Sequence, residues 1–124
     1  MKSELIKKIE QIENRLKTVV DQSSGENIAF ELNERTNLLS ETPQIMELAT
    51  KIYDEAKGKL AEEMFFDEKK LNAKQQIQIM YISGKLKEEN ALYVRAERCV
   101  KALDNSIKGL ITLLSYDKTI TSRT

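Results

Sequence analysis

The chain has 124 residues, the size of one domain, and its 20 basic and 20 acidic side chains leave it without net charge. It contains no histidine, no tryptophan, one cysteine and one proline. This composition excludes zinc sites built from several cysteine or histidine ligands, and it excludes histidine-activated nucleophiles. The four glycines are scattered and none is followed by Lys-Ser or Lys-Thr, which excludes a phosphate-binding loop. We therefore expect no enzyme activity, no metal and no cofactor.

The chain also carries no pattern typical of a membrane or secreted protein. No stretch approaches the ~20 apolar residues of a membrane span, and no apolar leader follows Lys2. The single Cys99 cannot form an intrachain disulfide, which is typical of a reducing compartment. We expect one cytoplasmic helical domain over residues 1–124 that does not contact a membrane.

Charge is unevenly distributed between the two halves of the chain. Residues 1–66 carry nine basic and thirteen acidic side chains, a net charge of −4, and residues 67–124 carry eleven and seven, a net charge of +4. One interpretation is that the acidic half folds onto the basic half. The other is that the basic half presents a surface to a polyanion or to an acidic partner.

The first predicted helix covers residues 4–20. Its apolar residues are spaced by four and three, as in a heptad seam: Leu5, Ile9, Ile12, Leu16 and Val19. The polar segment 21–25 ends it, and Ser23 with Glu26 has the spacing of a capping box. That box predicts a second helix over residues 26–40. We expect it to bury Ile28, Leu32 and Leu39.

Thr42 and Pro43 mark the start of a third predicted helix over residues 43–64, because threonine caps helices and proline suits their first position. One face of this helix is apolar and includes two alanines that would allow close packing: Ile45, Ala49, Ile52, Ala56 and Leu60. The segment Phe65–Lys70 is predicted to be a loop. Asn72, with Gln75 three residues later, is predicted to cap the element that follows.

The last predicted helix covers residues 72–117, a run of 46 residues without proline. It would span roughly 70 Å, longer than a compact domain of this size. A first apolar stretch contains Ile79, Ile82 and Leu86. A second, longer stretch contains Leu92, Ala96, Cys99, Leu103, Ile107, Leu110 and Leu114. Either the helix breaks near the polar segment Gly84–Asn90, or it is the backbone of an elongated or oligomeric assembly.

Gly84 and Gly109 inside this helix would mark a bend or a close helix contact. Cys99 lies on the apolar seam, which predicts a buried and inert thiol. Three tyrosines are predicted to lie at the rim of the core: Tyr81, Tyr93 and Tyr116. No alternating β-branched run or hairpin turn occurs, so the predicted fold is all-α, a helical bundle with a long C-terminal helix.

Two groups of residues are candidate binding surfaces. At 100° per residue, four cations cluster within about 80° of helix surface, opposite the seam: Lys87, Arg98, Lys101 and Lys108. Such a stripe would bind a nucleic-acid backbone, although basic residues are also ordinary on an outer helix face, and Glu97 and Asp104 lie at its margin. The second group, Phe65 and Phe66 with Lys69 and Lys70, would stack nucleic-acid bases or close the end of the bundle.

The C-terminal half closes with an amphipathic Leu-Asp-x-x-Ile-Lys-like segment at 103–108, within a long helical run preceded by a shorter helix rich in Ala and Lys. This pattern extends from Met80 to Ser115. In it, the C-terminal half of the chain resembles the C-terminal helices of T4-type phage recombination mediators. Members of that family are small, helical, ring-forming proteins that bind single-stranded DNA and help to load a recombinase. The resemblance implies oligomerisation through the long helices and DNA contact through cations.

Three functions therefore stay open at the level of sequence. The first is a non-enzymatic phage-type accessory protein that oligomerises and binds single-stranded nucleic acid or its protein complexes in the host cytoplasm. The second is a small helical inhibitor that binds a host protein, such as a phage antagonist of a CRISPR or other defence nuclease. The third is a structural coiled-coil subunit.

Overall fold

The computed structural model describes residues 1–66 and 75–123, and the side chains of residues 1–64 and 78–116. In chain order, the helices are α1 (Lys2–Leu16), α2 (Gly25–Leu39), α3 (Thr42–Phe66), α5 (Gln75–Lys85) and α6 (Lys87–Arg123). The described residues contain no strand. The all-α prediction is confirmed. Within this part of the chain, no helix has the length and apolar content needed to cross a membrane.

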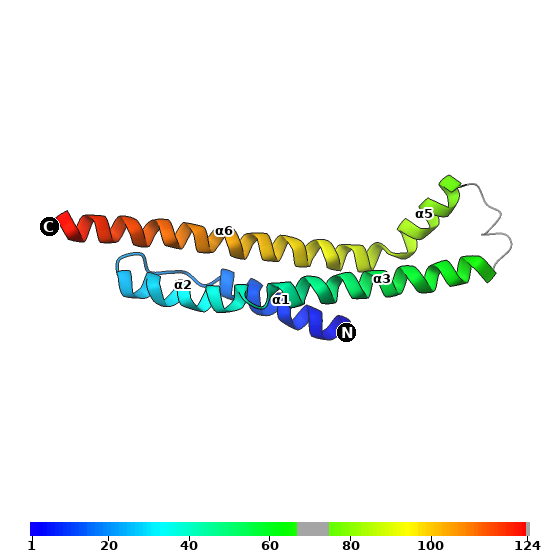
Figure 1. Cartoon of the computed structure of the whole chain (residues 1–124), viewed down its shortest axis with the longest axis horizontal. Coiled ribbons are helices and arrows are strands. Elements are labelled where there is room, and N and C mark those ends of the chain that lie inside the picture. The colour runs from blue at the N-terminus through cyan, green and yellow to red at the C-terminus, as the bar shows by residue number, and fades with distance from the viewer. Residues whose placement is uncertain (67–74, 124) are drawn as a thin grey trace.

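The molecule is elongated along α6, and the other helices are arranged around it (Figure 1). α2 and α3 lie end to end along α6 and run in the opposite direction, whereas α1 packs beside the middle of the row, against α3 and α6. Only Ser40 and Glu41 separate α2 from α3, and Ser40 keeps helical dihedral angles (φ −63°, ψ −20°). α2 and α3 therefore follow one another in a single row along α6 (Figure 1).

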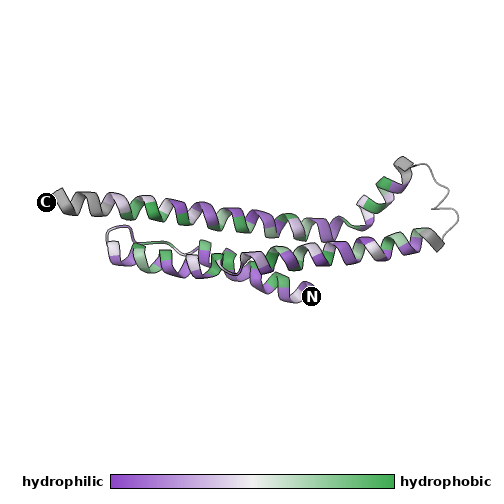
Figure 2. Ribbon diagram, in the orientation of Figure 1, coloured by the Kyte–Doolittle hydropathy of each residue, from purple (hydrophilic) through white to green (hydrophobic). Residues whose placement is uncertain are grey.

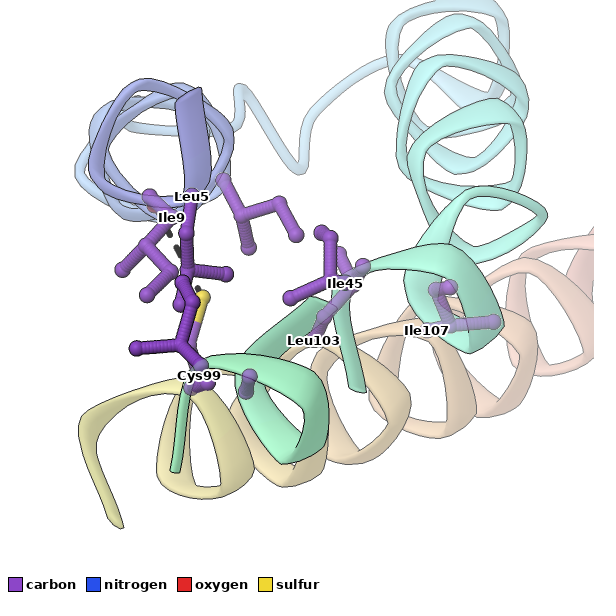
Figure 3. Packing of buried hydrophobic residues seen from close by; sticks show 10 residues of the cluster. Leu5, Ile9, Ile45, Cys99, Leu103 and Ile107 are labelled. Atoms are coloured by element: carbon purple, nitrogen blue, oxygen red, sulfur yellow. Dashed lines mark hydrogen bonds between the residues drawn. The ribbon is translucent and has the colours of Figure 1, made fainter. Parts of the chain in front are cut away.

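The main core lies where α1, α3 and α6 meet. Each helix is amphipathic, with hydrophobic residues recurring along it (Figure 2), and the apolar faces meet at this junction. Leu5 and Ile9 of α1 point toward Cys99 of α6, and Ile45 of α3 lies beside Leu103 (Figure 3). The predicted seams are confirmed for the residues that are buried here: Leu5, Ile9, Ile12, Ile45, Ala49, Ile52, Ala96, Cys99, Leu103 and Ile107. Leu32 and Leu39, predicted to be buried, are only half-buried.

α1 ends earlier than the sequence pattern predicted. It stops at Leu16, and Val19 is 92% exposed instead of continuing the seam. The β-branched run Thr18-Val19-Val20 is a poor helix former, since such side chains lose rotamer freedom in a helix. The chain leaves the helix here and runs back to the start of α2.

The predicted capping box at the start of α2 is wrong. The N-cap residue is Ser24, and its side chain makes no capping hydrogen bond. The Ser23 hydroxyl instead donates to Asp21 Oδ1 at 2.6 Å. The carboxylate of Asp21 therefore engages the hydroxyl that the capping box required, as acidic side chains in turns often do.

The boundary between α2 and α3 also differs from the prediction. α3 begins at Thr42, not at Pro43, and the Thr42 hydroxyl donates backward to the Leu39 carbonyl at 2.8 Å. Thr42 is buried, and its hydroxyl links the first residue of α3 to the last residue of α2. A capping threonine would instead accept a hydrogen bond from a backbone N–H of α3.

The long C-terminal element is broken within the predicted segment Gly84–Asn90, which confirms the first of the two alternatives left by the sequence; assembly into an oligomer stays a prediction. Helix 72–117 is wrong as a single unit: α5 ends at Lys85 and α6 begins at Lys87, on either side of Leu86. Leu86 is buried and still takes part in helical hydrogen bonds. Its N–H donates to the Ile82 carbonyl, and its carbonyl accepts from the Asn90 N–H. The bend therefore costs little hydrogen bonding. α5 turns away from α6 beyond it (Figure 1).

The glycine prediction is correct only at the bend. Gly84 lies two residues before it, but α6 continues as a helix through Gly109. A methyl group added at either glycine would meet nothing within 4 Å, so neither allows a close helix contact.

A second, smaller core lies where α3, α5 and α6 meet. Its buried members are Leu60, Met64 and Leu86, and the side chains packed around them include Tyr53, Tyr81 and Ile82. The predicted loop at Phe65–Lys70 is wrong for its first two residues, because α3 continues through Phe66. The rest of that loop and the Asn72 cap lie outside the described residues.

Candidate functional site

The predicted basic stripe lies on the outer face of α6. All four of its cations are exposed: Lys87, Arg98, Lys101 and Lys108. Two of them have a carboxylate partner one turn earlier on the same helix. Lys101 Nζ lies 3.3 Å from Glu97 Oε1, and Lys108 Nζ lies 2.9 Å from Asp104 Oδ2. These pairs reduce the charge that the stripe offers to a polyanion.

The two other cations of the stripe, Lys87 and Arg98, have no ion pair with any described residue. Arg98 lies at a groove between α1 and α6 whose walls include Leu16, Val94 and Ala102. The structure places all four cations on one face but leaves only these two uncompensated. A role in binding nucleic acid stays a prediction.

Ion pairs between helices do not follow the simple separation of an acidic and a basic half. Arg95 of α6 donates to Glu13 of α1 at 2.6 Å, as expected if acidic residues of the first half meet basic residues of the second. Lys2, however, reverses the pattern, because it donates to Glu89 of α6 at 2.8 Å. The hydrogen bond to Glu89 raises the pKa of Lys2, and the same bond lowers the pKa of Glu89. The halves fold onto each other mainly through their apolar seams.

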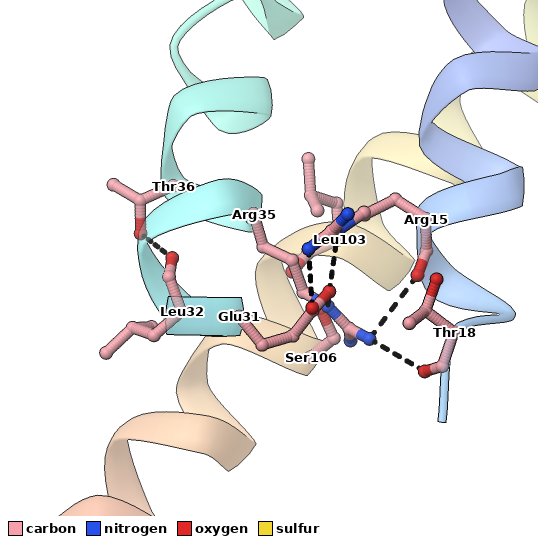
Figure 4. Close-up of polar contacts among 8 residues, drawn as sticks. All are labelled: Arg15, Thr18, Glu31, Leu32, Arg35, Thr36, Leu103 and Ser106. Carbon is pink, nitrogen blue, oxygen red and sulfur yellow. Dashed lines mark hydrogen bonds and ion pairs between the residues drawn. The ribbon is translucent and has the colours of Figure 1, made fainter. Parts of the chain in front are cut away.

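Sequence reasoning missed a buried charged cluster of three residues, Arg15, Glu31 and Arg35 (Figure 4). Arg15 of α1 makes a bidentate pair with Glu31 of α2, through Nε at 2.8 Å and Nη2 at 2.6 Å. Arg35, one turn after Glu31, donates to the same carboxylate at 3.0 Å. The side chains of Glu31 and Arg35 are only 6% and 7% exposed.

This cluster ties the end of α1 to α2. Arg35 Nη2 also donates to the backbone carbonyls of Arg15 and Thr18, at 3.5 and 3.4 Å, at the C-terminal end of α1 and just beyond it. The Arg15 carbonyl accepts from the Thr18 N–H as well. Burial alone would raise the pKa of Glu31, but the hydrogen bonds from Arg35 and Arg15 outweigh it and hold the pKa below its ordinary value. The Glu31–Arg35 spacing of four residues was the only indication in the sequence.

The helix α5 exposes two neighbouring large apolar side chains. Ile79 is 55% exposed and Met80 is 73% exposed. Tyr81 is half-buried, with the ammonium group of Lys85 5.7 Å from its ring centroid. The side chains of Phe65, Phe66, Lys69 and Lys70 lie outside the described residues, so the prediction that they form a binding surface stays a prediction.

Cys99 is buried in the main core, as predicted. Its Sγ lies 3.7 Å from the Ile9 carbonyl oxygen, and burial raises the pKa of the thiol to about 11. At neutral pH the reactive thiolate is therefore scarce.

No group of histidine, cysteine, aspartate and glutamate residues in the described part of the chain is arranged to hold a metal ion. No family model, curated protein or solved structure matches this chain. Function must therefore be argued from the surfaces described above.

Proposed function

We propose that this protein is a non-enzymatic helical binding protein that docks onto another protein, with α5 as the apolar part of its docking surface. The observation that carries the proposal is the exposure of Ile79 and Met80 on a helix that turns away from α6. A single exposed apolar residue is ordinary on a protein surface. Two large neighbours on a helix that turns away from α6 are better suited to being covered by a partner.

The chemistry of the two candidate surfaces supports a protein partner over a nucleic acid. Methionine is enriched in protein interfaces, where its flexible side chain adapts to a partner. The stripe on α6, in contrast, has two of its four cations already paired with Glu97 and Asp104. A small helical inhibitor or adaptor is therefore the function that the geometry supports best.

The test compares substitutions at the two ends of the molecule. Ile79→Ser with Met80→Ser removes the apolar surface of α5, and Ile111→Ser with Tyr116→Ser is a matched control, because those residues are 49% and 66% exposed on α6. A partner is identified by crosslinking to the wild-type protein, purified, and titrated against all three proteins by calorimetry. We expect the α5 double variant to lose binding and the control to retain it.

Both variants should keep the helical circular dichroism signal of the wild type, since every substituted residue is exposed. Equal binding by the α5 variant and the wild type would reject α5 as the docking surface. Equal loss in both variants would show that the effect is not specific to α5.

A second candidate, a single-stranded nucleic-acid-binding accessory protein, is favoured by Lys87 and Arg98, whose charges are uncompensated on one face. The resemblance of the C-terminal half to phage recombination mediators points the same way. Anisotropy of a labelled single-stranded oligonucleotide, measured over a range of salt concentrations, tests this function. Each phosphate contact should contribute about 0.7 to the slope of log affinity against log salt. Binding that is absent at low salt, or that does not respond to Arg98→Glu, would reject it.

A further inference from the structure

A small pocket lies between α3 and α6, apart from the stripe and from Ile79 and Met80. It has a volume of about 270 Å³ and is lined by Thr50, Tyr53, Asp54, Asn90 and Tyr93. The rings of the two tyrosines have centroids 6.4 Å apart and are tilted by 53°. At this separation the two rings contact each other, and both line the pocket.

The core holds both rings in place. Tyr53 packs against the small core at the α5 end, and Tyr93 packs against the main core. Each ring is half-buried, so one part is fixed by packing while another part lines the pocket. A site built on two packed helices keeps its geometry without a ligand.

The remaining groups in the pocket suit a positive charge. Asp54 is exposed and has no ion pair with any described residue. Asn90 and Thr50 add a carbonyl oxygen and a hydroxyl group, both able to accept hydrogen bonds. Aromatic faces attract cations within about 6 Å of the ring centroid, and both tyrosine rings line this pocket.

We propose that this pocket binds an organic cation, an alkylammonium or guanidinium group, beside the rings of Tyr53 and Tyr93 and against the carboxylate of Asp54. The group is supplied either by a lysine or arginine side chain of a polypeptide or by a free small amine. This site is independent of the docking surface on α5, because neither Ile79 nor Met80 lines it.

The test is a titration followed by NMR of the tyrosine ring protons. The probes are Nα-acetyl-lysine amide, Nα-acetyl-arginine amide and n-butylammonium, and Nα-acetyl-norleucine amide is the neutral control. We expect saturable shifts of the Tyr53 and Tyr93 signals with the cations and none with norleucine. Tighter binding of the amino-acid derivatives than of n-butylammonium identifies a polypeptide side chain as the source, and the reverse order identifies a free amine.

Substitutions separate a cation site from a simple contact between two rings. Tyr93→Leu should weaken binding on the order of fivefold, whereas Tyr93→Phe, which keeps the aromatic face, should bind nearly as the wild type does. Asp54→Asn should weaken binding roughly two- to fivefold. The exposed Tyr116→Leu and Asp104→Asn serve as controls and should have no effect.

Shifts with norleucine equal to those with lysine, or no saturable shift with any cation, would overturn the proposal. The proposal would also be overturned if both the Asp54→Asn variant and a folded Tyr93→Leu variant bound the cations as tightly as the wild type does. If Tyr93→Leu fails to fold, the exposed Asp54 still decides, because its substitution does not touch the core.

Discussion

The middle of the molecule and its α5 end are built from the same two long helices, yet they are covered differently. In the middle, α1 closes the angle between α3 and α6, and Leu5, Ile9 and Leu103 have no exposed surface. At the other end α5 packs against α3 and α6, and among the side chains described there the cluster of buried residues is Leu60, Met64 and Leu86. There, Ile79 and Met80 remain exposed.

The difference shows what a third helix contributes. Two packed helices bury one seam and leave their flanks in water, whereas a third helix along their groove removes the flanks as well. The central section therefore supplies most of the apolar burial that stabilises the fold. The described part of the α5 end has fewer buried residues, so we expect it to open at a lower free energy than the middle.

The largest expected effect is the loss of the buried carboxylate that holds α1 in place. Glu31→Ala leaves Arg15 and the buried Arg35 without their partner and should lower the free energy of unfolding by about 3–5 kcal/mol. Chemical denaturation measures this loss. Glu97→Ala, which removes an exposed pair with Lys101, is the control and should cost less than about 1 kcal/mol. Equal costs would mean that α1 is not anchored by this cluster.

The next effect compares one leucine of the middle with one residue of the α5 end. Leu103→Ala should lower the free energy of unfolding by about 2–5 kcal/mol, because the seam around it cannot collapse fully onto the cavity. Ile79→Ala, at a side chain already half in water, should change it by about 0.5 kcal/mol or less. Similar costs for the two substitutions would contradict the contrast between the two regions.

Acid should loosen the middle before it unfolds the rest. The pKa of Glu31 in the folded protein lies below its ordinary value of 4.5, so the unfolded chain binds its proton more readily. The resulting stabilisation is complete above pH 4.5 and is lost as the pH falls through the folded value. Thermal unfolding followed from pH 7 to pH 3 should show this decline. Glu31→Gln should show a flatter profile, and an unchanged profile would assign the decline to other carboxylates.

The smallest effect on stability is expected on the outer face of α6. Reversing Arg98 and Lys101 to glutamate should shift the free energy of unfolding by about 0.5 kcal/mol or less, since both side chains are exposed. A protein partner that approaches this face should then associate more slowly at low salt. Unfolding of the double variant would show instead that these cations stabilise the bundle.

The local features of the chain were largely predictable from its sequence. Heptad spacing located the buried seams of α1, α3 and α6, because a helix brings every third and fourth residue to one face. The polar segment after Gly84 indicated the break that occurs at Leu86. The early end of α1 was missed, since the pattern continues to Val19 while the β-branched residues before and after it disfavour a helix.

The candidate sites depended much more on the tertiary structure. The stripe was visible in the sequence as a set of angles on one helix, and the structure added only its pairing with Glu97 and Asp104. The pocket between Tyr53 and Tyr93 was not visible, because the two residues are 40 positions apart and meet only when α3 and α6 pack. The sequence predicted a rim position for Tyr93, which is correct because that residue is half-buried. The same prediction is wrong for Tyr116, which is 66% exposed.

The sequence by itself determined that this protein is helical, which faces of its helices are apolar, and that histidine- and multi-cysteine-based sites are excluded, since these follow from residue types and their spacing. The tertiary structure alone decided that α2 and α3 share one row along α6, that α1 closes only the middle, and that Glu31 lies between two arginines. Interactions between distant segments depend on how the faces are matched in space, and helical periodicity contains no information about that match.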